Sequence, residues 1–401
     1  MSVRQSLPLL LLLACANPPA EPPPPTAATA APAAAMGLPA LPPTTACTAL
    51  KAQVPGPLAA EREKAAGAPL AIARLHVREA RLTGDPGFYT LADMALRCAL
   101  DANPDDLEAQ RLEAHVQLQF HRFAAVEATA AALTARPGAS WMDFMLLGDA
   151  LMEQGELDRA ADAYQRAMDQ RPGLELYDRV AWLRWLWGDV PGALELQQLA
   201  VSSGSDLDPE PLAWALTRLG WLHALTGQPA PELDTALGLL PDYRPARFAR
   251  GRLRLFQGDR AGAAEDLRAA GPTVEAAWAL EETGLAGPQD PTVESLKTQD
   301  PRGYASYILE SDPKQAVSLL EEELAQRHDA VTRIALAAAR AHLGQDTRAE
   351  LQAALATGIN EPRALLQAGL ILNDLSLMQR AAAMGPGLLP SERARIPEIK
   401  P

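Results

Sequence analysis

The sequence has little of several things on which common functional classes depend. It has three cysteines in 401 residues and no C-x-x-C pair, which excludes a disulfide-dense scaffold and a zinc or redox site built on that motif. Beyond the N-terminus it has no run of about 18 or more apolar residues, so no later segment is typical of a transmembrane helix. The net charge of −14 argues against nonspecific binding to nucleic acid or to an anionic membrane surface.

Signatures of catalysis are missing as well. The chain has no G-x-S-x-G motif, no P-loop and no G-x-G-x-x-G that opens a helix after a strand. None of the histidines forms H-E-x-x-H or a pair at ligand spacing with a nearby carboxylate or thiol. The six histidines are scattered: His76, His115, His121, His223, His328 and His342. We therefore predict no enzyme, no cofactor and no metal site.

The N-terminus reads as an export signal over residues 1–14. Arg4 supplies the positive start and residues 7–13 supply a short apolar region. The sequence Leu-Leu-Ala before Cys15 resembles a bacterial lipobox, in which the cysteine is acylated and becomes the first mature residue. The alternative is a plain secretory signal that is cleaved elsewhere. Ala16, in place of Asp, points within the lipoprotein family to the outer membrane, so we expect an exported chain attached to the cell envelope by a lipid anchor.

A tether is predicted over residues 15–45. Its stretch 16–43 holds ten of the 35 prolines and many alanines, a composition that buries too little apolar surface to fold. Cys47 follows, at the start of the predicted folded part. With Cys15 lipidated, Cys47 and Cys98 are the remaining thiols, and two alternatives stay open: a disulfide between them, or two buried free thiols.

Residues 141–172 have the clearest pattern in the chain, two short amphipathic helices joined by a tight turn. The first predicted helix has small and apolar residues on one face: Phe144, Leu147, Gly148 and Leu151. Gly155 follows it, where glycine tolerates a left-handed backbone. The second helix has Ala160, Tyr164 and Ala167 on one face, and Pro172 ends it. Gly148 and Ala160 allow the two backbones to approach closely, while Tyr164 fills the space beside them.

This pattern resembles the tetratricopeptide repeat, whose signature is W-x2-L-G-x2-Y, then A-x3-F, then P. Phe144 stands in place of the Trp and Leu151 in place of the first Tyr. The other signature positions are matched by Leu147, Gly148, Ala160, Tyr164 and Pro172. The resemblance implies an all-α, right-handed superhelical solenoid of helix-turn-helix hairpins, and its concave surface commonly receives an extended peptide or a helix of another protein.

Weaker copies of the pattern extend the predicted solenoid over residues 46–386, with nine or ten hairpins. The best repeats lie at 68–270 and 328–358, and the pattern is degenerate at 271–327, where an irregular pair of helices is expected around Trp278. We predict a C-terminal tail over residues 387–401.

The resemblance places the first helix of each hairpin on the concave side. Aligning these helices on their turn glycines predicts the residues of a groove, which is aromatic and methionine-lined in the middle and basic at its N-terminal end. These residues are Arg74, Arg78, Arg81, Met142, Met145, Asp149, Met152, Glu175, Asp178, Trp182, Trp185, Trp214, Trp221, Phe248, Arg252 and Leu255. Two other interpretations stay open. The apolar helix around 180–187 fits packing between repeats, and the tryptophans also fit an oligomer interface.

The function predicted from the sequence is therefore a lipid-anchored, exported scaffold that binds a protein partner through this groove, in cell-envelope assembly or secretion. The role in the envelope rests on analogy with tetratricopeptide lipoproteins and is not specific. The alternative is binding of a small molecule or glycan in the aromatic groove, because tryptophans also stack on sugars.

Overall fold

The computed structural model describes residues 55–397, which form α-helices without a strand. In chain order the first helices are α2 (Ala59–Lys64), α3 (Pro69–Thr83), α4 (Gly87–Ala102), α5 (Leu107–Gln119), α6 (Phe123–Thr134), α7 (Trp141–Glu153), α8 (Leu157–Gln170), α9 (Leu174–Leu186), α10 (Val190–Ser202), α11 (Pro209–Leu225), α12 (Glu232–Leu239), α13 (Arg244–Gln257) and α14 (Arg260–Ala269). They are followed by α15 (Val274–Thr283), η1 (Glu294–Leu296), α16 (Pro301–Tyr307), α17 (Pro313–Leu324), α18 (Ala330–His342), α19 (Arg348–Ala356), α20 (Pro362–Leu372), α21 (Leu375–Ala383), η2 (Gly385–Gly387) and α22 (Pro390–Arg393).

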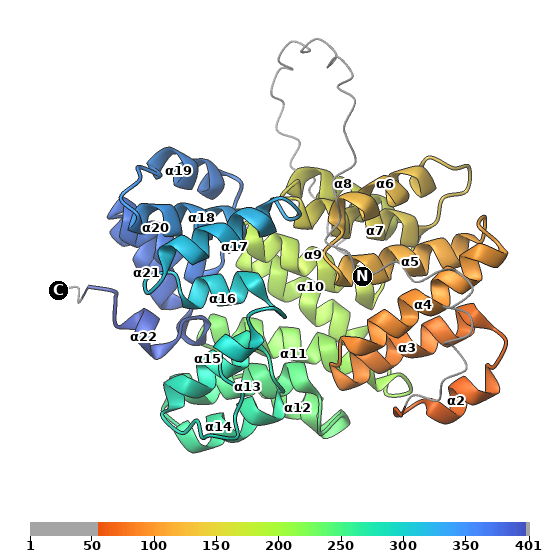
Figure 1. The fold of residues 1–401 in the computed structure, drawn as a ribbon, viewed down its shortest axis with the longest axis horizontal. Helices are drawn as coiled ribbons and strands as arrows, with labels where there is room; N and C mark the ends of the chain where they lie inside the picture. The colour runs from red at the N-terminus through yellow and green to blue at the C-terminus, as the bar shows by residue number, and fades with distance from the viewer. Residues whose placement is uncertain (1–54, 398–401) are drawn as a thin grey trace, which may run out of the picture. The chain divides into compact units, whose positions relative to one another are not determined.

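Consecutive helices pack in pairs, from α3 with α4 to α13 with α14, and again from α16 with α17 to α20 with α21. Figure 1 shows the path of these hairpins, from α3 on the right, over α7 and α8 at the top, through the middle to α13 and α14, and on to α18–α21 at the left. The predicted all-α, right-handed solenoid of about nine hairpins is confirmed for the described residues.

The predicted close approach within the hairpin of α7 and α8 is confirmed. A Cβ atom added at Gly148 would overlap the ring of Tyr164, and both Tyr164 and Ala160 have no exposed surface. The Tyr164 hydroxyl donates to Asp149 Oδ1 at 2.7 Å. Gly155 has a φ of 76°, the left-handed conformation that a side chain at this turn would strain.

Aspartates begin many of the helices. Asp189 follows Gly188 in the turn before α10, and its Oδ1 accepts a hydrogen bond from the Gly192 backbone N–H at 3.1 Å. Asp259, after Gly258, does the same for Gly262 at 2.9 Å. A carboxylate at this position satisfies an N–H that has no partner inside the helix, and it interacts favourably with the helix dipole. The repeated Gly-Asp dipeptide therefore ends one helix and starts the next.

Two expectations for the C-terminal half were wrong. The region 273–298 has a single α-helix, α15, followed by a loop and the short η1, because Pro and Gly residues between them interrupt the second helix. The predicted tail begins too early, since residues 385–397 pack back onto the solenoid. Leu388 and Leu389 are buried there, and Arg252 of α13 donates to the Pro386 carbonyl oxygen at 2.9 Å. The sequence also did not predict α2.

The signal, the lipidated Cys15, the tether and Cys47 lie outside the described residues. Cys98 is on α4 and takes part in a disulfide bond. Its predicted pairing with Cys47 stays a prediction, because Cys47 is not described. Within residues 55–397 no helix is both long and apolar enough to cross a membrane.

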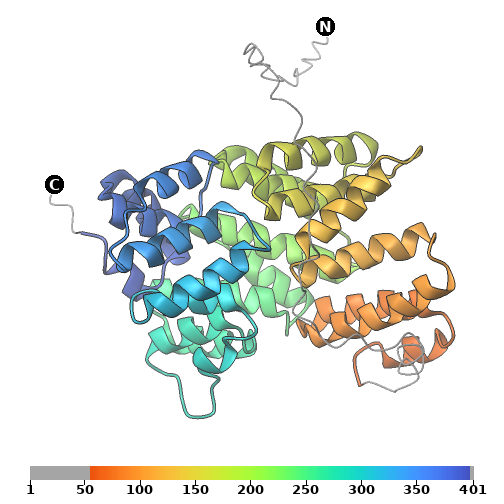
Figure 2. The ribbon, with the colours of Figure 1, turned by 45° about the horizontal axis from the view of Figure 1, so that its top comes forward.

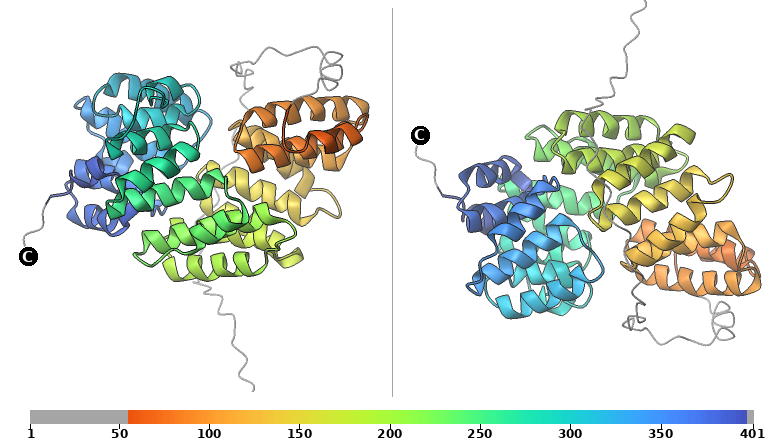
Figure 3. Two further views of the ribbon diagram at one scale, coloured as in Figure 1. Left: turned by 90° about the horizontal axis from the view of Figure 1, so that it is seen from below. Right: turned by 90° about the horizontal axis from the view of Figure 1, so that it is seen from above.

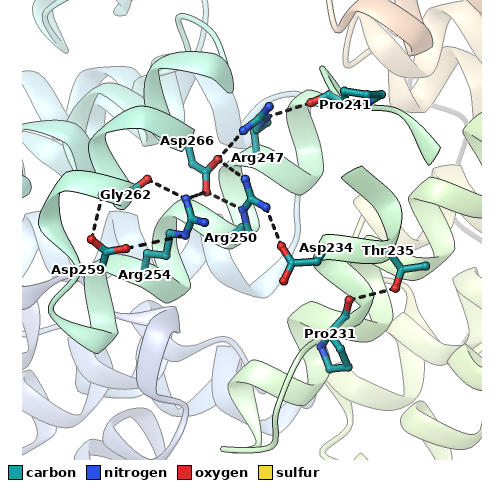
Figure 4. A network of polar contacts seen from close by, with 10 residues as sticks. All are labelled: Pro231, Asp234, Thr235, Pro241, Arg247, Arg250, Arg254, Asp259, Gly262 and Asp266. Atoms are coloured by element: carbon teal, nitrogen blue, oxygen red, sulfur yellow. Dashed lines mark hydrogen bonds and ion pairs between the residues drawn. The ribbon is translucent and has the colours of Figure 1, made fainter. Parts of the chain in front are cut away.

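The hairpin of α13 and α14 depends on a charged network around Asp266, which is fully buried (Figure 4). Its carboxylate accepts hydrogen bonds from Arg247 at 2.9 Å, Arg250 at 2.7 Å and Arg254 at 2.8 Å. These arginines are spaced by three and four residues, so they lie on one face of α13. Arg250 also donates to the exposed Asp234 of α12 at 2.6 Å. One buried carboxylate thus accepts hydrogen bonds from three guanidinium groups.

We expect Gly148→Ala to lower the free energy of unfolding by about 1–3 kcal/mol, because the methyl group would push α7 away from Tyr164. The matched control is Gly238→Ala. Gly238 is exposed on α12 with no atom near its missing Cβ, so alanine should leave stability unchanged or raise it by up to about 1 kcal/mol. Chemical denaturation followed by circular dichroism measures both. Equal effects of the two changes would contradict the proposed close approach.

Asp266→Asn is expected to lower the free energy of unfolding by about 3 kcal/mol, because it removes the buried carboxylate to which three guanidinium groups donate. Burial alone would raise the pKa of Asp266, but hydrogen bonds from Arg250 and Arg247 outweigh it and hold the pKa below its ordinary value. The wild type therefore exceeds the variant in free energy of unfolding by the full amount above the pKa of the unfolded state, about 3.9. This difference should shrink as the pH falls from there through the lower pKa of the folded state.

Asp234→Asn is the control, since this exposed carboxylate binds the same Arg250 and should contribute less than about 1 kcal/mol. Melting temperatures measured between neutral pH and about pH 3 test both. A difference for Asp266→Asn that grows on acidification would refute the assignment.

Candidate functional site

A cavity of about 930 Å³ lies on the concave side of the N-terminal half of the solenoid. Five first helices contribute to its wall, namely α3, α5, α7, α9 and α11. Each contributes residues three or four apart, so one stripe of every helix faces the cavity. On α7, for example, these are Met142, Met145, Asp149 and Met152. The expectation that first helices line the inner surface therefore holds for these five hairpins.

The wall has an aromatic and methionine-rich part in its middle. Trp141, Met145 and Met152 of α7 face the cavity together with Trp182 of α9 and Trp214 of α11. Trp214 is partly exposed, and its indole Nε1 donates to Asp178 Oδ2 at 3.1 Å. A wall of this kind gives large apolar contact area with few rotatable bonds, while the methionines can adapt to a bound group.

The charged side chains of the wall are mostly paired with one another. Arg179 Nε donates to Asp149 Oδ1 at 2.6 Å, and Arg327 Nε lies 3.0 Å from Glu153 Oε2. The remaining pairs are Arg74 with Glu108, Arg81 with Glu210, and Arg111 with Asp143. The predicted basic patch at the N-terminal end is therefore wrong: Arg74 and Arg81 are each neutralised by a carboxylate of the same chain. Arg78 lies outside the cavity, 3.9 Å from Asp208.

Burial controls the protonation of the groups in the wall. Burial, assisted by Arg179 and Arg81, lowers the pKa of His115 to about 4, so this imidazole is neutral at physiological pH. Burial likewise raises the pKa of Glu153, an effect that Arg327 opposes. In residues 55–397 no group of His, Cys, Asp and Glu side chains is arranged to hold a metal ion.

A second cavity of about 430 Å³ adjoins the first, and the two share five lining residues: Met152, Glu153, Trp182, Arg218 and Arg327. Most of its other lining residues come from the C-terminal half, among them Val331 and Ile359, and α9 also contributes Leu186. The shared residues form the junction of the two cavities, which we call the junction below.

The cavities are closed at their sides because successive turns of the superhelix touch. At one place Arg81 of α3 pairs with Glu210 of α11, and Arg244 donates to the Gly84 carbonyl oxygen at 3.1 Å. At the other, Gln154 lies 2.5 Å from His328 Nδ1, and its amide donates to the Gln326 carbonyl oxygen at 3.3 Å. In Figures 2 and 3 the blue helices of the C-terminal half lie beside the yellow-green helices that come directly after α7 in the chain. Contacts between turns thus border the groove, which remains open to solvent.

Of the twelve residues predicted as the partner-binding groove, seven line the first cavity: Arg74, Arg81, Met145, Asp149, Met152, Trp182 and Trp214. The other predicted residues that line it are Met142, Glu175 and Asp178. The structure places the rest elsewhere, with a physical reason in each case.

Trp185 is fully buried in the core, packed with Leu222 and Ile334. It follows Trp182 by three residues, which leaves it about 60° short of a full helical turn and directs it at the neighbouring hairpin. Trp221 shares a face with Trp214 but lies two turns further on, where it packs against the same core. For these two tryptophans the alternative of packing between repeats is the correct one.

The predicted residues on α13 are also displaced from the cavity. Arg252 is buried and bonded to Pro386, Phe248 packs against a core cluster, and Leu255 is part of that cluster. The cause is the returning C-terminal segment, which covers the concave face of α13. Nothing in the local pattern of α13 indicated that a segment more than a hundred residues later would lie there.

Three residues important for the wall were missed: Trp141, Arg179 and Arg218. Arg218 follows Trp214 by four residues and Arg179 follows Glu175 by four, the spacing of one helical turn. Both lie within the span of the predicted stripe, and including the residue one turn after Glu175 and after Trp214 would have found them.

No family model matches the chain, and no curated protein matches its sequence. Among solved structures it is similar to the APC/C hetero-tetramer Cut9–Hcn1, with a TM-score of 0.44 and 14% identity over 77% of this chain and 56% of that one. It is also similar to yeast Tom70, with a TM-score of 0.39 and 12% identity over 87% and 93%, and to a monomeric mutant of IFIT1 with Gppp-AAAA, with a TM-score of 0.40 and 14% identity over 80% and 70%. The chain therefore spans little more than half of the Cut9–Hcn1 chain. At these TM-scores the likeness says nothing about the ligand of this protein.

Proposed function

We propose that this chain is an exported, lipid-anchored scaffold that binds a segment of a partner protein in its central cavity, within an assembly of the cell envelope. The observation that carries the proposal is the first cavity. Five consecutive hairpins each present one stripe of their first helix to the same cavity, and the stripes combine into an aromatic and methionine-rich wall. Aromatic residues that line a concave site dominate binding energy in many protein interfaces.

The pairing of the charged groups in the wall supports the proposal. Most of its charges are bonded within the chain, so the apolar residues between them are the available contacts. An extended segment fits such a wall because its side chains alternate in direction and its backbone groups remain free to bond with polar groups at the rim.

The lipid anchor is proposed from the lipobox-like sequence that ends at Cys15, and the tether would hold the solenoid away from the membrane. If fully extended in a polyproline II conformation, the 28 residues of 16–43 would reach roughly 90 Å, at about 3.1 Å per residue. That reach would allow the cavity to meet a partner beyond the lipid headgroups.

A second candidate function is binding of a small molecule or glycan, which the volume of the first cavity favours. About 930 Å³ falls within the range of roughly 300–1,000 Å³ that is typical of small-molecule sites. A melting-temperature shift with glycan fragments, without one for peptides, would favour this function over the first.

For partner binding, Trp182→Ala together with Trp214→Ala should lower the yield of crosslinked partner on the order of tenfold or more, because both rings line the cavity. The measurement is crosslinking with mass spectrometry in the native host, with circular dichroism to show that the helices persist. Trp187→Ala is the matched control, since this tryptophan is exposed and outside the cavity wall. Undiminished crosslinking in the double variant would sink the proposal.

For the anchor, metabolic labelling with a palmitate analogue should mark the wild-type protein and be lost in Cys15→Ala. Cys47→Ala is the control and should keep the label, because it leaves the lipobox-like sequence unchanged. Labelling that persists in Cys15→Ala, or that is lost in Cys47→Ala alone, would contradict the lipoprotein assignment.

A further inference from the structure

Arg218 differs from the other arginines of the first cavity. Its closest carboxylate is Asp178, whose Oδ1 lies 3.6 Å from Arg218 Nε, beyond hydrogen-bond distance. That carboxylate already accepts hydrogen bonds from Gln197 at 3.0 Å and from Trp214 at 3.1 Å. Arg218 Nε is buried without a hydrogen-bond partner, and its terminal nitrogens donate to no residue in the described part of the chain. Arg218 is therefore a cation with unused donors.

Two other arginines near it, Arg327 and Arg302, are close to more carboxylates. Arg327, which also lies at the junction, has a buried Nε without a hydrogen-bond partner too, but three carboxylates lie within 4.0 Å of it, those of Glu153, Glu323 and Asp329. Arg302, in the second cavity, has a contact of 3.6 Å with Asp329. Burial would lower the pKa of Arg302, but Asp329, Glu153 and further carboxylates outweigh that effect and raise it. Both are close to several carboxylates, whereas Arg218 has one carboxylate within 4.0 Å, which also accepts hydrogen bonds from two neutral donors.

Two tryptophans hold the Arg218 guanidinium in place. Its Cζ lies 4.3 Å from the centre of the Trp182 ring and 5.7 Å from that of Trp214. Contacts of this kind with the faces of aromatic rings orient a guanidinium without using its hydrogen-bond donors. The side chain keeps 21% of its surface exposed, so an incoming group can reach it. Little rotamer entropy remains to be lost when an anion binds.

The position of Arg218 indicates which kind of anion fits. It lies at the junction, and wall residues continue on both sides: the methionines of α7 in the first cavity, and Leu186, Val331 and Ile359 in the second. A partner segment whose C-terminal carboxylate binds Arg218 would occupy one cavity only. A segment whose internal acidic residue binds Arg218 can place apolar neighbours in both cavities. A carboxylate matches the planar donor fork of arginine in shape and charge.

We propose that Arg218 receives the side-chain carboxylate of an Asp or Glu within an extended partner segment that passes from the first cavity into the second. The inference rests on the proposed function, since it specifies the segment that the cavity binds. The recognised segment has an acidic residue at the junction and apolar residues on either side of it. The other charged groups of the wall, being paired, provide no second anchor of this strength.

The test is selection of random linear peptides displayed on phage against the full-length chain, with the C-terminal end of each peptide fused so that no free carboxyl terminus is present. We expect enriched peptides to share an Asp or Glu with apolar residues on both sides. Changing that acid to its amide, or changing the protein by Arg218→Gln, should each weaken binding about ten- to hundred-fold. The two changes together should weaken it no further than either alone.

Arg159→Gln is the matched control, because Arg159 is exposed on α8, pairs with Glu127 and lies outside both cavities. It should bind the selected peptides as the wild type does. Should Arg218→Gln melt early, the comparison of acid and amide peptides on the wild-type protein still decides, because it leaves the protein unchanged.

Three outcomes would overturn the inference, and they differ in what they say about the proposed function. Peptides that bind without an acidic preference, or with one that Arg218→Gln leaves unchanged, refute the role of Arg218 while peptide binding in the cavity stands. Binding that requires a free C-terminal carboxylate, found with released peptides only, refutes the internal residue. If no selected peptide binds the wild-type protein more tightly than it binds the variants Trp182→Ala and Trp214→Ala, both the inference and the proposed function are refuted.

Discussion

The structure depends first on the close approach of the two helices in its hairpins, which a glycine on the first helix permits. A Cβ at Gly148 would overlap Tyr164, one at Gly220 would lie 2.9 Å from Leu233, one at Gly251 2.9 Å from Leu267, and one at Gly369 2.8 Å from Met378. In each case the large side chain comes from the second helix of the same hairpin. This contact sets how closely the two helices of each hairpin pack, and the hairpins are the units that stack into the solenoid.

Contacts between successive turns of the superhelix border the groove. They join residues 129 to 174 positions apart, as between Arg81 and Glu210 or between Gln154 and His328. These contacts are polar, and exposed polar pairs contribute little stability and weaken with salt. An apolar cluster also joins distant hairpins, since Trp185 of α9 shares a core with Ile334 of α18 and Leu365 of α20. The C-terminal turns are therefore joined to α9 by apolar burial as well as by polar pairs.

Local pattern was sufficient to predict the hairpins and the inner face of the first five. The stripe on α7 and the position of Trp182 and Trp214 follow from the 3.6-residue period and from the turn glycines alone. The misplaced residues share a different cause. Trp185, Trp221 and Arg252 are covered by segments that arrive from later turns, including residues 385–397. Small rotations from one hairpin to the next add up to that arrangement, and the sequence of a single repeat does not contain their sum.

The charges of the groove also depend on contacts that the sequence of a single repeat does not contain. From sequence, Arg74, Arg78 and Arg81 form a basic stripe, but their partners, among them Glu108 and Glu210, come from other hairpins. A count of arginines in a predicted groove therefore overstates its attraction for anions. What decides is how many carboxylates of the chain surround a guanidinium that keeps unused donors. In the first cavity this criterion selects Arg218, because it has one carboxylate within 4.0 Å whereas Arg327 has three. The tryptophans contact Arg218 by their ring faces, and its nearest carboxylate also accepts hydrogen bonds from other donors. An unused donor in a low-dielectric wall gains more from a bound carboxylate than a paired one does, since the paired cation would first have to give up its partner.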